Sequence, residues 1–210
     1  AASLAYLALR QRDAVGLALF SNKIVRFVKP TNVSGHWKTL VDGLNMQSER
    51  GGKADPAASA VWSDRTSIRA VLDDLAERLQ RRTLIILISD LFDDVSETLM
   101  GLKRLRHNKN ELIVLNIWDP AEMRFPFEGL TMFEGLEGSG RLMTDPRSLR
   151  TRYLSEVRQF VEALRRGCRE MQIDFVRLDT SLALDSAISA YLTTRSASIR
   201  QRSSRVLGGG

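Results

Sequence analysis

The chain has 210 residues, of which 43% are hydrophobic and 27% are charged, as expected of an ordinary soluble protein with one substantial core. No apolar run approaches the roughly 20 residues that a membrane-spanning helix needs. The formal net charge is +6, but four arginines and no acidic residue occur from Arg195 onward, so the rest of the chain is nearly neutral. Charge therefore gives little indication of a nucleic-acid-binding surface. We expect residues 196–210, rich in Ser, Arg and Gly, to be a disordered tail.

Cysteine usage and the first residues bear on localisation. The single Cys168 cannot form an intrachain disulfide, and nothing at the start of the chain resembles a signal peptide. Both observations favour the cytoplasm. The sequence begins with Ala1, and its first residues read as the middle of a helix, so we expect either processing or a longer parent protein.

Apolar periodicity in the first part of the chain predicts helices and a hairpin. We expect a helix over 2–10, a hairpin of strands over 15–20 and 24–28, a helix over 36–44, a polar loop over 45–65 and an amphipathic helix opened by Thr66. The second strand of the hairpin is expected to end at Lys29-Pro30.

The rest of the chain alternates between strand and helix patterns. Strands are predicted over 84–88, 112–117 and 173–178, and helices over 96–107, 146–171 and 182–192. Between 121 and 145, aromatic residues, glycines and alternating polarity predict a β-hairpin excursion. This alternation predicts an α/β fold, a doubly wound and mostly parallel sheet with right-handed crossovers and flanking helices.

The most informative stretch is TLIILISDLFDD, residues 83–94. Its unbroken apolar run over 84–88 predicts a strand that is covered on both faces. The run ends abruptly at Ser89 and Asp90, and further acids follow. Ligands of open α/β sheets bind beyond the carboxyl ends of the strands. Asp90 is therefore the first candidate for a functional site.

Helix capping is the simpler alternative for the acids in this part of the chain. Ser89, Asp93 or Ser96 could cap the helix that follows the strand. Asp119 and Glu122 follow a second buried strand, so they could lie on the same sheet edge as Asp90 or only shape the next turn. Spacing alone leaves both alternatives open.

Familiar catalytic motifs are absent from the sequence, which contains no G-x-S-x-G, no G-x-G-x-x-G and no phosphate-binding loop. His36 and His107 have no carboxylate or cysteine at ligand spacing, so no zinc site is indicated. Cys168 falls on the apolar stripe of its helix and is expected to be a small core residue.

Five segments together carry a resemblance to a known family: RQRDAVGLALF (10–20), TSIRAVLDDLAERLQRRTLIILISDLFDD (66–94), NIWDPAEMRFPFEG (116–129), RYLSEVRQFVEAL (152–164) and IDFVRLDTSLALDSAISAYLTTR (173–195). They resemble the domain-of-unknown-function 58 (DUF58) proteins, bacterial relatives of the von Willebrand factor A domain. SDLFDD and DPAE are the most specific pieces. The resemblance implies one von Willebrand factor A-like domain over 1–195, incomplete at its N-terminus.

The resemblance also implies a function. Such proteins are typically partners of MoxR-type AAA+ ATPases and are not enzymes. Related A domains hold Mg²⁺ in a metal-ion-dependent adhesion site built from three loops, of which the second and third supply a Thr and an Asp that match Thr66 and Asp90. We therefore expect a cytoplasmic protein-interaction module whose metal ligands are Thr66 and Asp90.

The chain departs from the family pattern at the other metal-binding residues. The first loop, Asp-x-Ser-x-Ser, would lie upstream of Ala1, and Arg65-Thr66-Ser67 stands where Gly-Thr-Asp is usual. A hard cation takes about six oxygen ligands, so we expect this stretch alone to bind Mg²⁺ weakly or not at all. The strand before the first loop would lie at the sheet centre. We therefore expect strands 15–20 and 84–88 either to leave a gap or to pair directly.

Two other functions are kept as alternatives. Asp90, Asp93, Asp94 and Asp119 could serve a Mg²⁺-dependent phosphoryl hydrolase on a doubly wound sheet, although no Lys, His or phosphate-binding loop accompanies them. Phosphatase assays with Mg²⁺ on the full-length protein would separate the two readings. The arginine-rich tail could instead bind RNA, which deletion of 195–210 would test.

Overall fold

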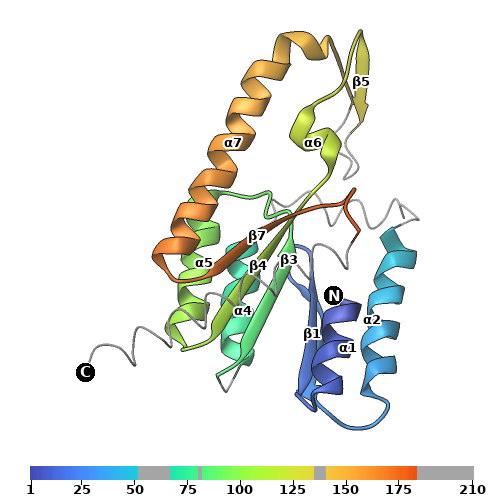
Figure 1. Ribbon diagram of the computed structural model, residues 1–210, viewed down its shortest axis with the longest axis vertical. Coiled ribbons are helices and arrows are strands. Elements are labelled where there is room, and N and C mark those ends of the chain that lie inside the picture. The colour runs from blue at the N-terminus through green and yellow to red at the C-terminus, as the bar shows by residue number, and fades with distance from the viewer. Residues whose placement is uncertain (52–66, 80–81, 135–140, 184–210) are drawn as a thin grey trace.

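The chain folds as a mixed α/β protein around a three-stranded parallel sheet in the order β3-β4-β7 (Figure 1). The computed structural model describes residues 1–51, 67–79, 82–134 and 141–183. The strands are β3 (Leu84–Ser89), β4 (Glu111–Trp118) and β7 (Asp174–Asp179), each within one residue of its predicted bounds. The helix predicted over 182–192, the tail over 196–210 and most of the loop predicted over 45–65 lie outside the described residues.

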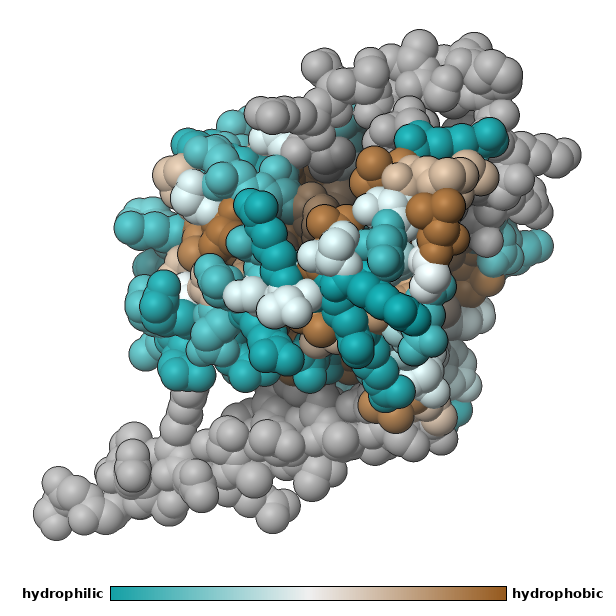
Figure 2. Space-filling view, turned by 90° about the horizontal axis from the view of Figure 1, so that it is seen from above, coloured by the Kyte–Doolittle hydropathy of each residue, from teal (hydrophilic) through white to brown (hydrophobic). Residues whose placement is uncertain are grey.

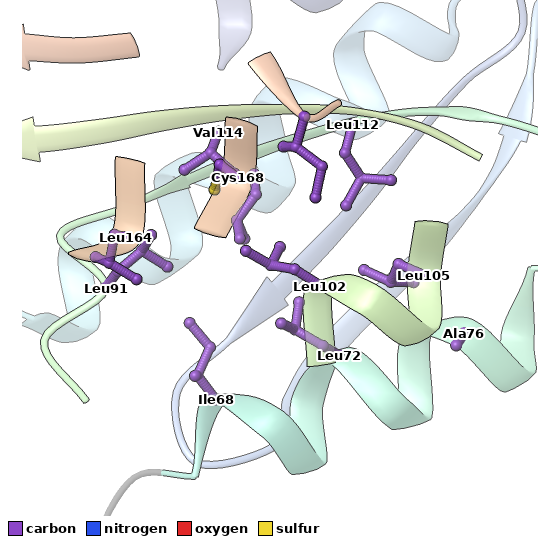
Figure 3. Close-up of a cluster of buried hydrophobic side chains, with 12 residues drawn as sticks. Ile68, Leu72, Ala76, Leu91, Leu102, Leu105, Leu112, Val114, Leu164 and Cys168 are labelled. Carbon is purple, nitrogen blue, oxygen red and sulfur yellow. The ribbon is translucent and has the colours of Figure 1, made fainter. Parts of the chain in front are cut away.

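Three helices cover one face of the parallel sheet (Figure 1). They are α4 (Ile68–Arg78), α5 (Val95–His107) and α7 (Pro146–Glu170). Their apolar stripes meet the sheet in one cluster, in which Leu72, Leu102 and Leu105 point toward one another (Figure 3). Cys168 belongs to this cluster and is fully buried, as predicted, and burial raises the pKa of its thiol to about 12. None of the described helices is long and apolar enough to cross a bilayer.

The opposite face of the sheet is also apolar. Ile86 and Ile88 of β3 alternate with the residues that face α4 and α5, and they pack with Ile113 and Leu115 of β4. Leu4 of helix α1 (Ala2–Arg10) contacts the same cluster. Within β3 only Leu87 is fully buried, Ile85, Ile86 and Ile88 are partly buried and Leu84 is exposed, so the prediction of a strand covered on both faces is confirmed only in part.

An antiparallel hairpin of β1 (Val15–Phe20) and β2 (Ile24–Thr31) forms a second sheet. The prediction that β2 ends at Lys29-Pro30 was wrong, because proline is tolerated on a strand whose N–H need not pair. Helix α2 (His36–Gly51) is also longer than the predicted helix over 36–44. Residues 45–51 continue it because they include good helix formers such as Met, Gln and Glu.

The two sheets are not hydrogen-bonded to each other. We predicted that strands 15–20 and 84–88 would either leave a gap or pair directly, and in the described part of the chain β1 and β3 do not pair. Among the described strands, β3 pairs only with β4. Leu84, at the start of β3, is half exposed.

The excursion between β4 and α7 begins with the short helix α6 (Pro120–Arg124) and contains the predicted hairpin, formed by β5 (Thr131–Glu134) and β6 (Arg141–Thr144). Phe125 attaches it to α7 by packing 4.5 Å from the ring of Tyr153, measured between ring centroids. Seen from above, the described surface is mostly hydrophilic with smaller apolar patches (Figure 2). Exposed apolar side chains of the excursion include Leu130, Met132 and Met143.

Candidate functional site

The three strands of the parallel sheet bring aspartates to one edge. Asp90 follows β3, Asp119 follows β4 and Asp179 ends β7. Because the strands are parallel, their carboxyl ends meet at the same edge, which points toward α6 and β5 in Figure 1. Asp119 thus shares an edge with Asp90, which is one of the two alternatives that the sequence left open. The place of Asp179 at this edge was not predicted.

The Asp90 carboxylate is exposed and lightly engaged. Its Oδ1 accepts two long hydrogen bonds of 3.3 Å, one from the backbone N–H of Phe92 and one from the hydroxyl of Ser89. Its Oδ2 has no hydrogen-bond partner within the part of the chain that the structure describes. One oxygen of this carboxylate is therefore open to a ligand from solvent.

Leu91 shapes the loop that carries Asp90. Its backbone has φ 58°, in the left-handed region that favours glycine. Its side chain is only 1% exposed. Burial in the main core offsets the cost of this backbone conformation. The Leu91 amide donates to the Ser89 hydroxyl at 3.0 Å, and its carbonyl accepts from the Asp93 amide at 2.8 Å. The loop is thus fixed by its own hydrogen bonds and by one buried side chain.

Asp93 joins this loop to the start of α4. Its Oδ2 accepts a hydrogen bond from the backbone N–H of Ile68 at 2.7 Å. A carboxylate at a helix N-terminus satisfies an unpaired amide and interacts favourably with the helix dipole. Thr66 lies two residues earlier, outside the described residues, so its predicted convergence with Asp90 stays a prediction.

Asp94 is the N-cap of α5. Its Oδ1 accepts from the backbone amides of Ser96 at 2.8 Å and Glu97 at 3.0 Å, and from the Ser96 hydroxyl at 2.5 Å. The Ser96 hydroxyl and then the Glu97 amide hold the pKa of the Asp94 carboxyl below its usual range. The expectation that Ser89, Asp93 or Ser96 caps this helix was therefore wrong. Asp94 reaches both free amides because it immediately precedes the first helical residue.

Asp119 and Glu122 form a capping box on α6. Asp119 accepts from the Ala121 amide at 2.8 Å, and Glu122 accepts from the Asp119 amide at 3.0 Å. The second oxygen of Asp119 accepts from the Thr180 hydroxyl at 3.1 Å, which ties the end of β4 to the end of β7. Of the two alternatives left open for this pair, shaping the next turn accounts for these bonds.

Asp179 has a similar local role at the end of β7. Hydrogen bonds from the hydroxyl and the backbone amide of Ser181 lower the pKa of its carboxyl, and the positive charges of Arg124 and Arg177 contribute in the same direction. This carboxylate therefore stabilises the turn that follows the strand.

The described residues do not complete a cation site. Among them, no three Asp, Glu, His or Cys side chains are grouped so that they could hold a metal ion. The Asp90 carboxylate accepts only long hydrogen bonds, whereas Asp93, Asp94 and Asp119 each accept a short bond from a backbone amide at a helix start. Because Mg²⁺ takes six oxygen ligands, most of its ligands would have to be water or residues outside the described part.

A buried polar pair behind Asp90 was missed in the sequence. Asn116 is fully buried on β4, and its Nδ2 donates to the Asp90 carbonyl at 2.7 Å. The indole N–H of buried Trp118 donates to the Oδ1 of Asn116. The signal was present, because Asn116 is a polar residue inside the apolar run LIVLNI. A buried amide needs hydrogen-bond partners, and Asn116 finds them in the carbonyls of Ser89 and Asp90 at the end of β3.

Together, these features define an α/β protein whose parallel sheet presents a carboxylate-rich edge, at which the Asp90 carboxylate accepts only long hydrogen bonds. Residues 1–162 match the family described as Protein of unknown function DUF58, and the chain belongs to that family. The family resemblance noted in the sequence is thereby confirmed over these residues. No curated protein and no solved structure matches the chain.

Proposed function

We propose that this protein is a non-enzymatic interaction module that binds another protein through the carboxyl edge of its parallel sheet. The proposed mode is that of the metal-ion-dependent adhesion site of a von Willebrand factor A-like domain, and the proposed partner is a MoxR-type AAA+ ATPase. The observation that carries the proposal is the exposed Asp90 carboxylate with its open Oδ2. It stands where ligands of open α/β sheets bind.

The different roles of the neighbouring acids support this choice of residue. Asp93, Asp94 and Asp119 each accept a short hydrogen bond from a backbone amide at the start of a helix. Asp90 accepts only long bonds, and no helix depends on it. An exposed loop carboxylate that the fold does not use for capping is available for recognition.

A bound Mg²⁺ would give the edge a positive centre that a carboxylate of the partner can coordinate. Asp90 and Thr66 are the proposed protein ligands, with water completing the shell. Asp93 would assist by holding the start of α4 beside the Asp90 loop through its bond to Ile68. Two protein ligands make a weak site, so we expect the partner to raise the affinity for the cation.

The proposal is tested by measuring the affinity of the full-length protein for a MoxR-type ATPase of the same organism. We expect Asp90→Ala to weaken binding about tenfold or more in Mg²⁺, because a charged contact is lost at the interface. Replacing Mg²⁺ by a chelator should weaken the parent protein to a similar degree.

Asp13→Ala is the matched control, since Asp13 is an exposed aspartate that precedes β1, a strand of the other sheet. Equal affinity of the Asp90→Ala and Asp13→Ala proteins would exclude this edge as the interface. A Mg²⁺-dependent phosphatase activity that Asp90→Ala abolishes would establish the hydrolase alternative instead.

A further inference from the structure

The side-chain amide of Asn116 contacts the candidate site from inside the sheet. Asn116 is aligned with Ser89 in the register of β3 and β4, at the last pair of that ladder. Its Nδ2 donates to the Asp90 carbonyl at 2.7 Å and lies 3.4 Å from the Ser89 carbonyl. The side chain thus holds the backbone of Ser89 and Asp90 at the point where strand pairing stops.

Trp118 fixes the orientation of this amide from the other side. Its indole N–H can only donate, and it donates to the Oδ1 of Asn116. The NH₂ group must then face the carbonyls of Ser89 and Asp90, because the reverse orientation would set donor against donor. Both side chains are almost fully buried, so water does not offer them other partners.

Phe160 of α7 links this pair to the exposed part of the loop. Its ring lies 6.3 Å from the Trp118 ring and 5.8 Å from the Phe92 ring, measured between centroids. Phe92 in turn donates its backbone N–H to the Asp90 carboxylate. Asp90 therefore accepts from Asn116 at its carbonyl and from Phe92 at its carboxylate. Phe92 and Trp118 both pack on the ring of Phe160.

We propose that Asn116 is the positioning residue for Asp90, and that Trp118 keeps its amide in the working orientation. Loss of the Asn116 amide removes the hydrogen bond to the Asp90 carbonyl. The Asp90 carboxylate then samples many orientations at the sheet edge instead of one. The effect on the loop is independent of what the loop binds. Only its consequence for cation or partner binding rests on the proposed function.

Asn110, which immediately precedes β4, provides a matched control at the other end of the same strand pair. It is also buried, at the opposite edge of the sheet, where its Oδ1 accepts from the Thr83 amide and its Nδ2 donates to the Leu105 carbonyl, both at 3.0 Å. Asn110→Ala therefore removes an equally buried amide that joins the segments around β3 and β4. It does so without touching Asp90.

The test compares backbone hydrogen exchange in the full-length Asn116→Ala and Asn110→Ala proteins. We expect Asn116→Ala to speed exchange of the Leu91 and Phe92 amides about tenfold or more, because both donate within the Asp90 loop. Asn110→Ala should leave these two amides at parental rates. Equal rates in the two variants would overturn the proposal.

A second measurement uses Mg²⁺ alone as the probe. If the parent protein binds it, Asn116→Ala should weaken the affinity severalfold and Asn110→Ala should not. If the parent protein binds no Mg²⁺ but Asn116→Ala still selectively speeds exchange in the loop, the positioning role is supported and the result counts against the proposed function. If Asn116→Ala does not fold, Trp118→Phe keeps the ring and removes the indole N–H. That variant should show the same selective exchange to a smaller degree, and its absence would also overturn the proposal.

Discussion

At the scale of single residues, neighbouring aspartates differ because of the groups that surround them. Asp93, Asp94 and Asp119 satisfy helix amides, whereas the Asp90 carboxylate accepts only long hydrogen bonds and caps no helix. Sequence spacing predicted the end of β3 to within one residue, since a buried apolar run ending in acids predicts a strand end. It could not assign the roles, because several acids stand within reach of the same helix start. Which amide points at which carboxylate depends on the turn made by Leu91.

Removal of the Asp94 cap should produce a pH-dependent loss of stability. Asp94→Ala should destabilise the protein at pH 7, because α5 loses the acceptor for two amides. Hydrogen bonds from Ser96 and Glu97 lower the pKa of this carboxyl in the folded state. A depressed pKa stabilises the fold above the unfolded pKa, and that contribution is lost as pH falls through the folded pKa.

The difference in unfolding free energy between parent and Asp94→Ala should therefore be complete at pH 7 and shrink below about pH 4. Urea unfolding at pH 7 and at pH 3 measures it. A difference that stays constant or grows at acid pH would show that Asp94 acts through something other than its charged form.

At the scale of elements, periodicity predicted most helices and strands because the apolar runs are sharply bounded. For this reason the predicted bounds of the three parallel strands differ from the observed bounds by no more than one residue. The errors lie where a local signal is overridden. Pro30 remains inside β2, since that strand has β1 as its only partner among the described strands and the missing N–H can face away. Residues 45–51 are polar enough to suggest a loop, yet they extend α2.

The packing of α4 on α5 depends on Gly101. A Cβ at this position would meet the Cδ1 of Leu72 at 2.8 Å and its Cβ at 3.0 Å. Gly101→Ala should therefore destabilise the protein by about 1–3 kcal/mol through overpacking, although alanine favours helices. Thermal or urea unfolding measures the change.

Gly43 of α2 is the control for that substitution. A Cβ there would find its nearest neighbours at 3.3 Å and 3.4 Å, on the flexible side chains of Leu17 and Arg26. Gly43→Ala should be neutral or stabilising by up to about 1 kcal/mol. If Gly101→Ala is as well tolerated as Gly43→Ala, the two helices are not closely packed at this point.

At the scale of the whole molecule, α4 connects the candidate edge with the second sheet. Its first residue, Ile68, is bound by Asp93, and near its end the Arg78 guanidinium lies 5.5 Å from the centroid of the Phe27 ring on β2. The sequence could not choose between a gap and direct pairing of β1 with β3. Strand pairing depends on long-range partners, whereas periodicity reports only the faces that a strand buries.

The most direct test of the proposed role is to locate the divalent cation that the full-length protein binds. Mn²⁺ takes the same carboxylate and water ligands as Mg²⁺, and it broadens the NMR signals of nearby amides. We predict selective broadening of the amides of Asp90, Phe92 and Ile68, and its loss in Asp90→Ala. The amides of Asn110 and Glu111, at the opposite edge, should stay sharp. Broadening centred elsewhere, or broadening that survives in Asp90→Ala, would contradict a cation site at this edge.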